Sequence, residues 1–163
     1  MELPVRVFCP IYIFTSSERC WKCGQLQSVI ALGARFLIDD QEEYGNIADT
    51  DSLILLNYIT LMPKNVFDYI SKISPRYIEH YSHTAGESYY ANTCECGANF
   101  GDFYLFSKPT GAFFPITSDM ATAIRYHQLP FQGELPFECS WSEGSGELIL
   151  QYARNESLIM KQC

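Results

Sequence analysis

The sequence predicts an α+β fold, in which a single strand-dominated domain spans residues 1–163 and carries two short amphipathic helices. Most apolar segments are short runs rich in β-branched and aromatic residues, a composition typical of strands. Only two segments space their apolar residues as one face of a helix does. Because 47% of the residues are hydrophobic and 15% aromatic, the chain can bury one core, and no linker or repeat divides it.

The first third of the chain predicts several strands. Val5–Phe14 is rich in β-branched and aromatic residues, and Pro10 within it indicates an edge strand or a bulge. Ser28–Asp39 predicts one or two strands. For Ser52–Thr60 two alternatives stay open, a buried strand or a short helix, because periodicity does not decide between them in so short an apolar run.

An acidic segment, Asp39–Asp51, lies between these strands and holds six acidic residues and no basic one. We expect a solvated loop there. Its first acids are Asp39, Asp40, Glu42 and Glu43, which lack the spacing of a calcium-binding loop. We therefore expect these four to be partner-binding residues that attract a basic protein.

Both predicted helices have recognisable ends. Met62–Ser74 has Pro63 in its first turn, where proline is well tolerated. Its apolar face consists of Val66, Phe67, Ile70 and Ile73. Thr117–Leu129 begins with a threonine or serine N-cap, and Pro130 ends it.

The remaining aromatic segments predict further strands. These segments are Arg76–His83, Phe100–Lys108 and Gly111–Ile116. Leu135–Ala153 predicts a hairpin that turns at Glu143–Gly146, where serine and glycine cluster between two β-rich runs.

Two close cysteine pairs, each followed by glycine, carry the clearest chemistry. "CWKCG" contains Cys20 and Cys23, and "CECG" contains Cys94 and Cys96. A tetrahedral zinc site with four thiolates needs two such turns, and glycine tolerates positive φ and can offer its amide to a thiolate. We predict that these cysteines bind one structural zinc ion in a split zinc ribbon, which requires Glu95 to lie in a turn.

Three alternatives to this ligand set stay open. The cysteines could be reduced and packed as small hydrophobic residues. Cys20 and Cys23 could form a redox pair, although no βαβ pattern surrounds them. His80 and His83 could complete a site with Cys20 and Cys23, but in a strand the two histidines would point to opposite faces.

Aromatic residues cluster around the second cysteine pair. They are Tyr89, Tyr90, Phe100, Phe103, Tyr104, Phe106, Phe113 and Phe114. We expect them to pack against the small metal site, which supplies little apolar core itself. Stacking of nucleic-acid bases is a second interpretation, and exposed aromatic residues in a protein interface are a third.

The cysteine segments also resemble a group of bacterial proteins, largely uncharacterised, that carry a split zinc ribbon. "CWKCG", "SVIALGA" and Tyr81–Pro115 carry the resemblance, which is most specific over Tyr89–Gly101. In that group the second knuckle typically reads Tyr-Tyr-x-Asn-x-Cys-x-x-Cys-Gly, followed by Gly-Asp and aromatic residues. The resemblance implies that the four paired cysteines match the metal ligands, and it implies no activity. This chain has one residue fewer inside its second knuckle.

Charge and composition limit the partners. The net charge is −8 with a pI of about 4.8, and the eleven Lys and Arg residues are scattered. Nucleic-acid binding is therefore disfavoured, because it draws on clustered cations. The sequence has no basic leader and no run of about 18 apolar residues, so we expect a cytoplasmic protein without membrane contact.

The predicted function follows from the closed zinc shell and the acidic charge. Four thiolates leave no open position for a reacting water, and the sequence has no phosphate-binding loop or nucleophile motif. We expect no enzyme and no small-molecule substrate, but an acidic protein-binding module, of the type of an inhibitor or immunity protein for a basic bacterial toxin or nuclease. The alternative is a zinc-ribbon nucleic-acid accessory protein.

Overall fold

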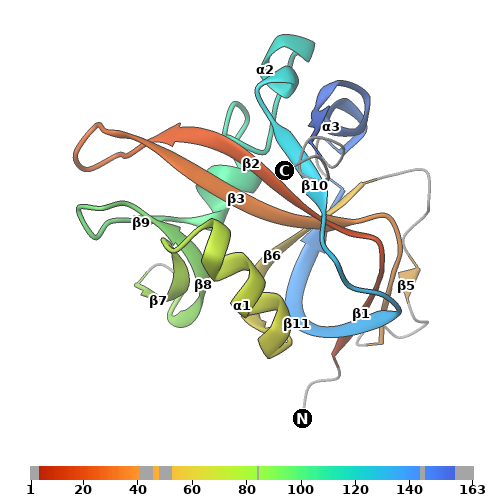
Figure 1. Ribbon diagram of the computed structural model, residues 1–163. Coiled ribbons are helices and arrows are strands. Elements are labelled where there is room, and N and C mark those ends of the chain that lie inside the picture. Colours follow the sequence, from red (N-terminus) through yellow and green to blue (C-terminus); the bar gives the residue numbers. More distant parts are fainter. Residues whose placement is uncertain (1–3, 41–45, 48–52, 84, 144–145, 157–163) are drawn as a thin grey trace.

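The computed structural model describes residues 4–40, 46–47, 53–83, 85–143 and 146–156. Strands dominate this part of the chain, and they form one large and one small sheet with a few short helices around them (Figure 1). The α+β, strand-dominated class predicted from composition is therefore confirmed.

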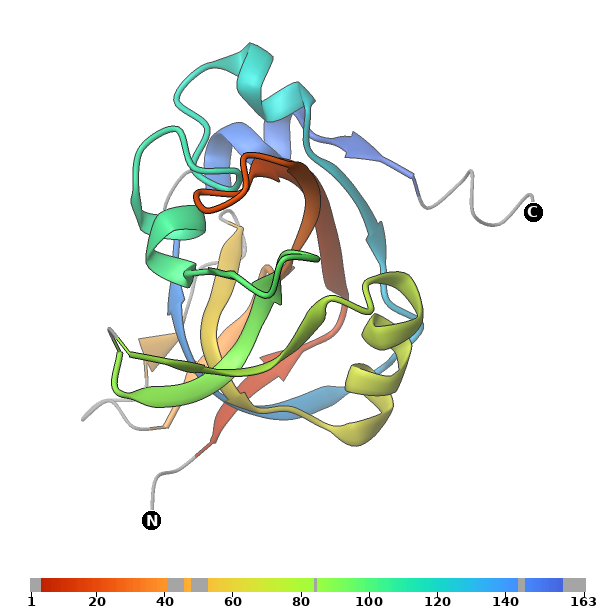
Figure 2. The same cartoon turned by 90° about the vertical axis from the view of Figure 1, so that its left-hand side faces the viewer.

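The large sheet has nine strands. They are β1 (Val5–Phe8), β2 (Ile11–Arg19), β3 (Leu26–Ala34), β4 (Leu37–Asp39), β5 (Asn46–Ile47), β6 (Ile54–Leu61), β10 (Arg125–Gln128), β11 (Glu134–Ser142) and β12 (Arg154–Asn155). Their order is β12-β10-β2-β3-β6-β11-β1-β4-β5, and only the β10–β12 pair is parallel. The sheet curves strongly around the interior of the molecule (Figure 2).

The strands expected in the first third of the sequence are present. Val5–Phe14 divides into β1 and β2 at Pro10, which has no N–H to donate to a ladder. Ser28–Asp39 corresponds to β3 and β4. The alternatives left open for Ser52–Thr60 are decided in favour of the strand β6.

The central strand β3 is buried on both faces. Ile30 and Leu32 contribute to one apolar cluster, whereas Val29 and Ala31 contribute to a second. Successive side chains of a strand point to opposite faces, so the sheet has a core on each side. The second core also contains two of the paired cysteines.

The small sheet consists of β7 (Tyr77–Ser82), β8 (Glu87–Thr93) and β9 (Asn99–Phe100). The strand expected over Arg76–His83 is thus confirmed. Asn92 of β8 attaches this sheet to β3: its Nδ2 donates to the Ile30 carbonyl at 2.9 Å, and its Oδ1 accepts from the Ile30 N–H at 2.8 Å. Asn92 is only 2% exposed, so this side chain satisfies two buried backbone groups of β3.

Of the two predicted helices, one is confirmed and one is too long. α1 (Lys64–Ile73) buries Val66 and Ile70 as its apolar pattern requires. α2 (Ser118–Thr122) starts where expected, with the Thr117 hydroxyl accepting from an N–H of the first turn. The expected helix over Thr117–Leu129 is wrong beyond α2, because residues 125–128 pair with β2 instead.

Two predicted strand segments that lie before α2 are wrong. In place of the strand over Phe100–Lys108 there is a π-helix, η1 (Phe103–Ser107), and Gly111–Ile116 forms turns. The chain folds back here because the Phe113 ring stacks on that of Phe106, with centroids 5.4 Å apart.

The expected second strand of the C-terminal hairpin is the helix α3 (Gly146–Tyr152). A Cβ atom at Gly146 would clash with the carbonyl oxygen of Leu53, so glycine allows this helix to pack directly on the backbone before β6.

Candidate metal centre

Both cysteine pairs lie in tight turns between antiparallel strands. The first knuckle, Cys20–Gly24, joins β2 to β3, and the second, Cys94–Gly97, joins β8 to β9. Glu95 lies in a turn, as a one-residue spacing requires. The Trp21 indole N–H donates to the Asn99 carbonyl at 2.9 Å, which connects the two knuckle segments. Figure 1 shows the two hairpin tips on the same side of the molecule.

Each knuckle is closed by a backbone hydrogen bond from its glycine, across four residues in the first and three in the second. Gly24 and Gly97 have φ values of 77° and 90°, and each donates its N–H to the carbonyl of the first cysteine of its knuckle at 2.9 Å. The expected bond from the glycine amides to a thiolate is therefore wrong, because these amides close the turns. The Lys22 N–H lies 3.4 Å from the Cys20 sulfur, so a different amide of the first knuckle is directed at a cysteine sulfur.

The four sulfurs have the spacing of a metal site. Cys20 Sγ lies 3.7 Å from Cys96 Sγ, Cys23 Sγ lies 3.6 Å from Cys94 Sγ, and all four atoms lie within 4.8 Å of one another. A tetrahedral ion bound at about 2.3 Å separates its sulfurs by about 3.8 Å, whereas a disulfide bond is about 2.05 Å long. These four residues therefore form a group that can hold a metal ion.

The centre is half inside the protein. Cys20 is 3% exposed and Cys94 is 0% exposed, whereas Cys23 and Cys96 are exposed. The two buried cysteines belong to the second core, together with Phe14, Phe100, Phe106 and Phe113. Part of the expected aromatic packing against the site is thus present. The exposure of the other two cysteines argues against their being ordinary core residues.

The backbone turns also act on the thiols electrostatically. The pKa of Cys20 is lowered to about 6, chiefly by the Cys23 N–H and also by that of Lys22. At Cys94 the N–H of Cys96 acts in the same direction, but burial and the neighbouring thiols outweigh it and raise the pKa to about 12. Crowded thiols share protons in this way, since like charges repel, and a divalent cation would hold all four as thiolates.

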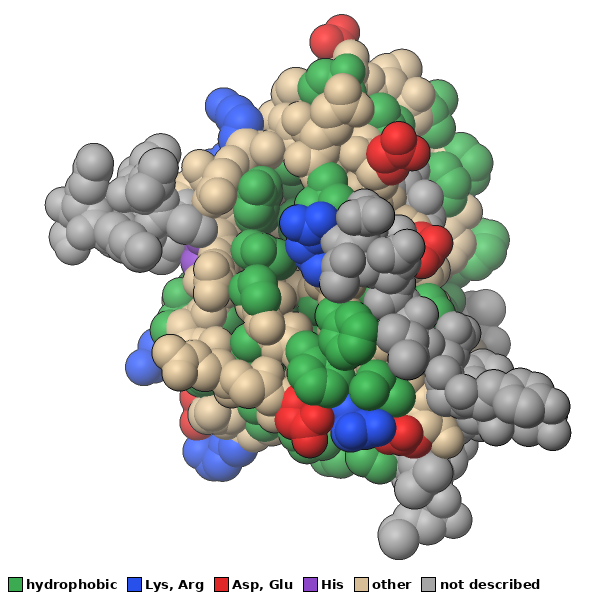
Figure 3. Space-filling view, turned by 90° about the vertical axis from the view of Figure 1, so that its right-hand side faces the viewer, with side chains coloured by type: hydrophobic (Ala, Val, Ile, Leu, Met, Phe, Trp, Pro, Cys, Tyr) green, Lys and Arg blue, Asp and Glu red, His purple; other side chains and the backbone are tan. Residues whose placement is uncertain are grey.

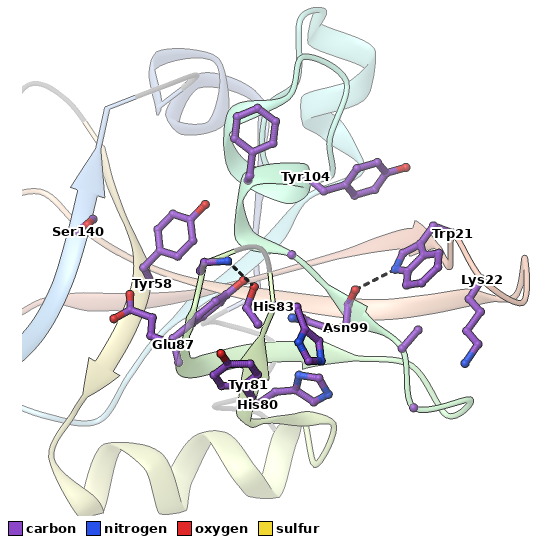
Figure 4. Close-up of a pocket in the computed structure, with 17 residues that line it drawn as sticks. Trp21, Lys22, Tyr58, His80, Tyr81, His83, Glu87, Asn99, Tyr104 and Ser140 are labelled. Carbon is purple, nitrogen blue, oxygen red and sulfur yellow. Dashed lines mark hydrogen bonds between the residues drawn. The ribbon is translucent and has the colours of Figure 1, made fainter.

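The two-cysteine, two-histidine alternative is not supported. The sulfurs of all four cysteines lie together, and neither histidine belongs to this group. His80 in β7 and His83 just after it instead line a pocket on the same side of the molecule (Figure 4).

The acidic segment begins inside the fold rather than in solvent. Asp39 belongs to β4, is 9% exposed and accepts a hydrogen bond from the Trp141 indole at 2.9 Å. Asp40 forms an ion pair with Arg6 at 2.7 Å. The expectation of a solvated loop is thus wrong at its first residue, because Asp39 pairs with Val5 of β1, and wrong again at Asn46–Ile47, which form β5 against β4. The other two predicted partner-binding residues, Glu42 and Glu43, lie outside the described residues.

The described acidic side chains do not form one patch on the face shown in Figure 3. There, acidic and basic side chains are interspersed with apolar ones. Arg6, for example, forms ion pairs with both Asp40 and Glu134. The net charge of the chain therefore does not by itself identify a contact surface.

Sequence reasoning missed a pocket of about 1140 Å³ beside the knuckles (Figure 4). Trp21 and Lys22 of the first knuckle line it, as do Gly97–Asn99 of the second. The β7–β8 hairpin, Tyr58 of β6, the start of η1 and Ser140 of β11 also line it. These segments are far apart in the sequence, and no local sequence pattern brings them together.

A buried acid, Asp102, is hydrogen-bonded to two residues of the pocket lining. Asp102, 3% exposed, accepts the Tyr58 N–H at 2.7 Å, and its own N–H donates to the Tyr89 hydroxyl at 3.3 Å. Burial raises the pKa of Asp102 to about 7. The rings of Tyr58 and Tyr89 meet edge to face with centroids 5.1 Å apart, so this network fixes two of the pocket's aromatic side chains.

No family model, curated protein or solved structure matches the chain. The resemblance to bacterial split-zinc-ribbon proteins therefore stays a prediction. Within the described residues, no helix has the length and apolar character needed to cross a membrane.

Proposed function

We propose that Cys20, Cys23, Cys94 and Cys96 hold one zinc ion and that the ion is structural. Four thiolates in tetrahedral spacing suit zinc, which has no redox chemistry of its own. The sulfur spacings of 3.6 and 3.7 Å support this assignment, and so does the amide directed at Cys20. The resemblance to split-zinc-ribbon proteins points to the same ligand set.

Such an ion stabilises the fold instead of performing a reaction. A four-thiolate shell has no open position, so no water or substrate can be activated on the metal. The sulfur pairs join positions 76 and 71 residues apart, which connects the β2–β3 hairpin to the small sheet. We accordingly propose a non-enzymatic protein in which metal binding is coupled to folding.

The domain held in this way is a protein-binding module. The observation that carries this proposal is a set of exposed aromatic residues lining the pocket: Trp21 is 66% exposed, Phe103 65% and Tyr81 50%. Protein interfaces are enriched in such residues, and an exposed apolar cluster indicates an interaction site. The net charge of −8 favours a basic partner.

An inhibitor or immunity protein is the functional class that fits these properties. A small acidic domain associates rapidly with a cationic nuclease or toxin, because opposite charges steer the encounter. We place the protein in the bacterial cytoplasm, where cysteine thiols stay reduced and available to zinc. This assignment rests on charge, size and the exposed aromatic residues.

The test is capture of the partner from the native host, followed by nuclease digestion. Purified wild-type protein is compared with Phe103→Ala, which removes an exposed ring of the pocket, and with Ile116→Ala. Ile116 is 54% exposed but does not line the pocket, so it is the matched control. We expect a basic protein to stay bound to wild type and Ile116→Ala after digestion, and to be reduced about tenfold on Phe103→Ala.

Two results would contradict this proposal. If digestion releases the captured material, the protein is the nucleic-acid accessory protein of the alternative prediction, and its exposed aromatic residues stack on bases. If Phe103→Ala captures as much as Ile116→Ala, the aromatic side of the pocket is not the contact surface.

A further inference from the structure

The pocket beside the knuckles has a charged group at each end and aromatic side chains between. Figure 4 shows Lys22 on its right-hand side and Glu87 on its left, and Tyr81 lies between them in that view. The aromatic lining consists of Trp21, Tyr58, Tyr81, Tyr89, Phe103 and Tyr104. A ligand here would meet ring faces along most of its length and a carboxylate at one end.

The backbone around the pocket departs from regular structure in two places. Tyr58, in the middle of β6, has a φ of 50°, a value that side-chain-bearing residues rarely adopt. Phe103 begins the π-helix η1, a form that is often found at functional sites. Strained positions of this kind persist where the surrounding structure requires them, and they cluster at binding sites.

Glu87 is the acidic residue of the pocket, and its carboxylate has no ion pair or hydrogen bond within the described part of the chain. Its side chain is exposed at the start of β8. Asp102, an acid nearby, is buried and already accepts a hydrogen bond from the Tyr58 N–H. Glu87 is therefore available to a cation that enters the pocket.

One hydrogen-bond acceptor of the pocket lining has no donor paired with it among the described residues. The Oδ1 atom of Asn99 is buried and has no hydrogen-bond partner among the described residues, although Asn99 lines the pocket. Buried acceptors are nearly always paired in folded proteins. A ligand made only of donors would suit this acceptor and the Glu87 carboxylate alike.

One aromatic ring of the lining is already in contact with a cation. The Lys108 ammonium lies 4.8 Å from the centroid of the Tyr104 ring, which is a cation–π contact. The positive charge of Lys22 at the far end lies beside the knuckles, where a zinc–thiolate centre has a net formal charge of about −2. At the Glu87 end the lining offers a carboxylate and aromatic faces.

We propose that this pocket binds an arginine side chain presented by an extended segment of the basic partner. The Tyr58, Tyr81 and Phe103 rings take its methylene groups and the face of the guanidinium, and Glu87 pairs with its edge. Arginine fits better than lysine, because a planar guanidinium stacks on aromatic rings, pairs with a carboxylate through two N–H groups and donates without accepting. This inference rests on the proposed function and names the chemistry that the partner must present.

The experiment is an NMR titration of the zinc-loaded protein with a blocked pentapeptide, acetyl-Ser-Gly-Arg-Gly-Ser-amide. The control peptide has citrulline in place of arginine, which keeps the shape and removes the charge. Protein variants are Glu87→Gln and the matched control Glu79→Gln. Glu79 lies on the same hairpin, is exposed, faces Tyr90 and does not line the pocket. Shifts of the Trp21 indole N–H and of the β7–β8 amides give the dissociation constants.

We expect the arginine peptide to bind at least fivefold more tightly than the citrulline peptide, since a charge-assisted pair and a cation–π contact are both lost with the charge. Glu87→Gln should weaken arginine binding about fivefold and leave citrulline binding unchanged, whereas Glu79→Gln should change neither. Equal binding of the two peptides, or equal binding to wild type and Glu87→Gln, overturns the inference.

The same variants separate this inference from the proposed function. A captured basic protein that binds Glu87→Gln as well as wild type leaves the binding module standing and contradicts the arginine pocket. Selective binding of the arginine peptide, combined with no capture of any basic protein, supports the pocket and contradicts the proposed partner class. Thermal melting of Glu87→Gln and of Tyr81→Leu, a second variant that removes a ring but keeps apolar area, shows that the comparison is made on folded protein.

Discussion

Asn92 is the residue on which the junction between the two sheets most directly depends. The side chain pairs with both backbone groups of Ile30, on an edge of β3 that β6 does not reach. The predicted resemblance to split-zinc-ribbon proteins includes this asparagine, just before the second knuckle. In this chain the residue joins the knuckle's own strand to the large sheet.

Substitution of Asn92 by alanine should lower the free energy of unfolding by about 2–4 kcal/mol, because two buried backbone groups lose their partners. Urea denaturation of the zinc-loaded protein measures this change. Asn65→Ala is the control, since Asn65 is exposed and only accepts a bond from the neighbouring Val66 N–H. A loss below about 1 kcal/mol for both variants would contradict the role given to Asn92.

The knuckle glycines allow a second test. Gly97 has a φ of 90° with no atom within 4 Å of an added Cβ, so Gly97→Ala introduces backbone strain without a steric clash. We expect a loss of about 1–2 kcal/mol in the free energy of unfolding. Gly101→Ala, which is equally uncrowded and has no positive φ, should be nearly neutral. Equal thermal stability of the two variants would show that the second knuckle does not require glycine.

The raised pKa of Asp102 predicts that the free energy of unfolding depends on pH. Its pKa is raised by burial to about 7 in the folded state, whereas an unfolded aspartate titrates near about 3.9. The folded protein therefore holds this proton where the unfolded chain has released it, so the stabilisation present below about pH 4 is lost as the pH rises through about 7. The difference between these two pKa values corresponds to a change of at most about 4 kcal/mol in the free energy of unfolding.

The free energy of unfolding is measured for wild type and Asp102→Asn at several pH values. The difference between the two proteins is compared, because it cancels effects that both share, including metal release in acid. Tyr58, Tyr77 and Tyr89 also face this carboxyl group, and none of them ionises in this range. We expect wild type to lose stability relative to Asp102→Asn between pH 4 and 7. A constant difference would contradict the buried, protonatable state of Asp102.

At the scale of the elements, composition predicted the strands β1 to β4 and left β6 open between a strand and a helix. The helix α1 follows from its apolar face. The same composition failed at η1 and α3, because contacts distant in sequence decide the conformation there. Stacking of Phe106 on Phe113 bends the first, and the fit of Gly146 against Leu53 admits the second.

The second predicted helix shows the competition between local and distant interactions. The cap at Thr117 starts α2 as the sequence indicates. Beyond it, Tyr126 pairs with Phe14 of β2, and their rings lie 5.3 Å apart. The open edge of β2 provides hydrogen bonds and apolar contacts that outweigh the helical propensity of this segment.

The candidate metal site was predictable and the pocket was not, for a physical reason. Cysteine spacing and the following glycines specify each knuckle locally, so two local signals identify all four cysteines of the group. The pocket depends on the φ of Tyr58 and on where the β7–β8 hairpin comes to rest, and neither is encoded in a short pattern. The acids at the start of the acidic segment were misjudged because Asp39 completes a strand pair with β1.

At the scale of the whole molecule, the group of four cysteines that can hold a metal lies where two structural units meet. The first knuckle ends the longest hairpin of the large sheet, and the second belongs to the small sheet. The four crowded thiols and the bond from Trp21 to Asn99 are contacts between the two tips. We therefore expect the zinc to hold the pocket in shape as well, since both knuckles line it.

The ligand set is tested most directly by the zinc content of purified protein, measured by native mass spectrometry for wild type, Cys94→Ser and Cys139→Ser. Cys139 lies in β11, outside the four-sulfur group, and is the matched control. We predict one zinc per chain in wild type and in Cys139→Ser, and none in Cys94→Ser, with a melting temperature lowered by more than about 10 °C. Stoichiometric zinc retained by Cys94→Ser, or a wild-type protein that binds none, would contradict the account.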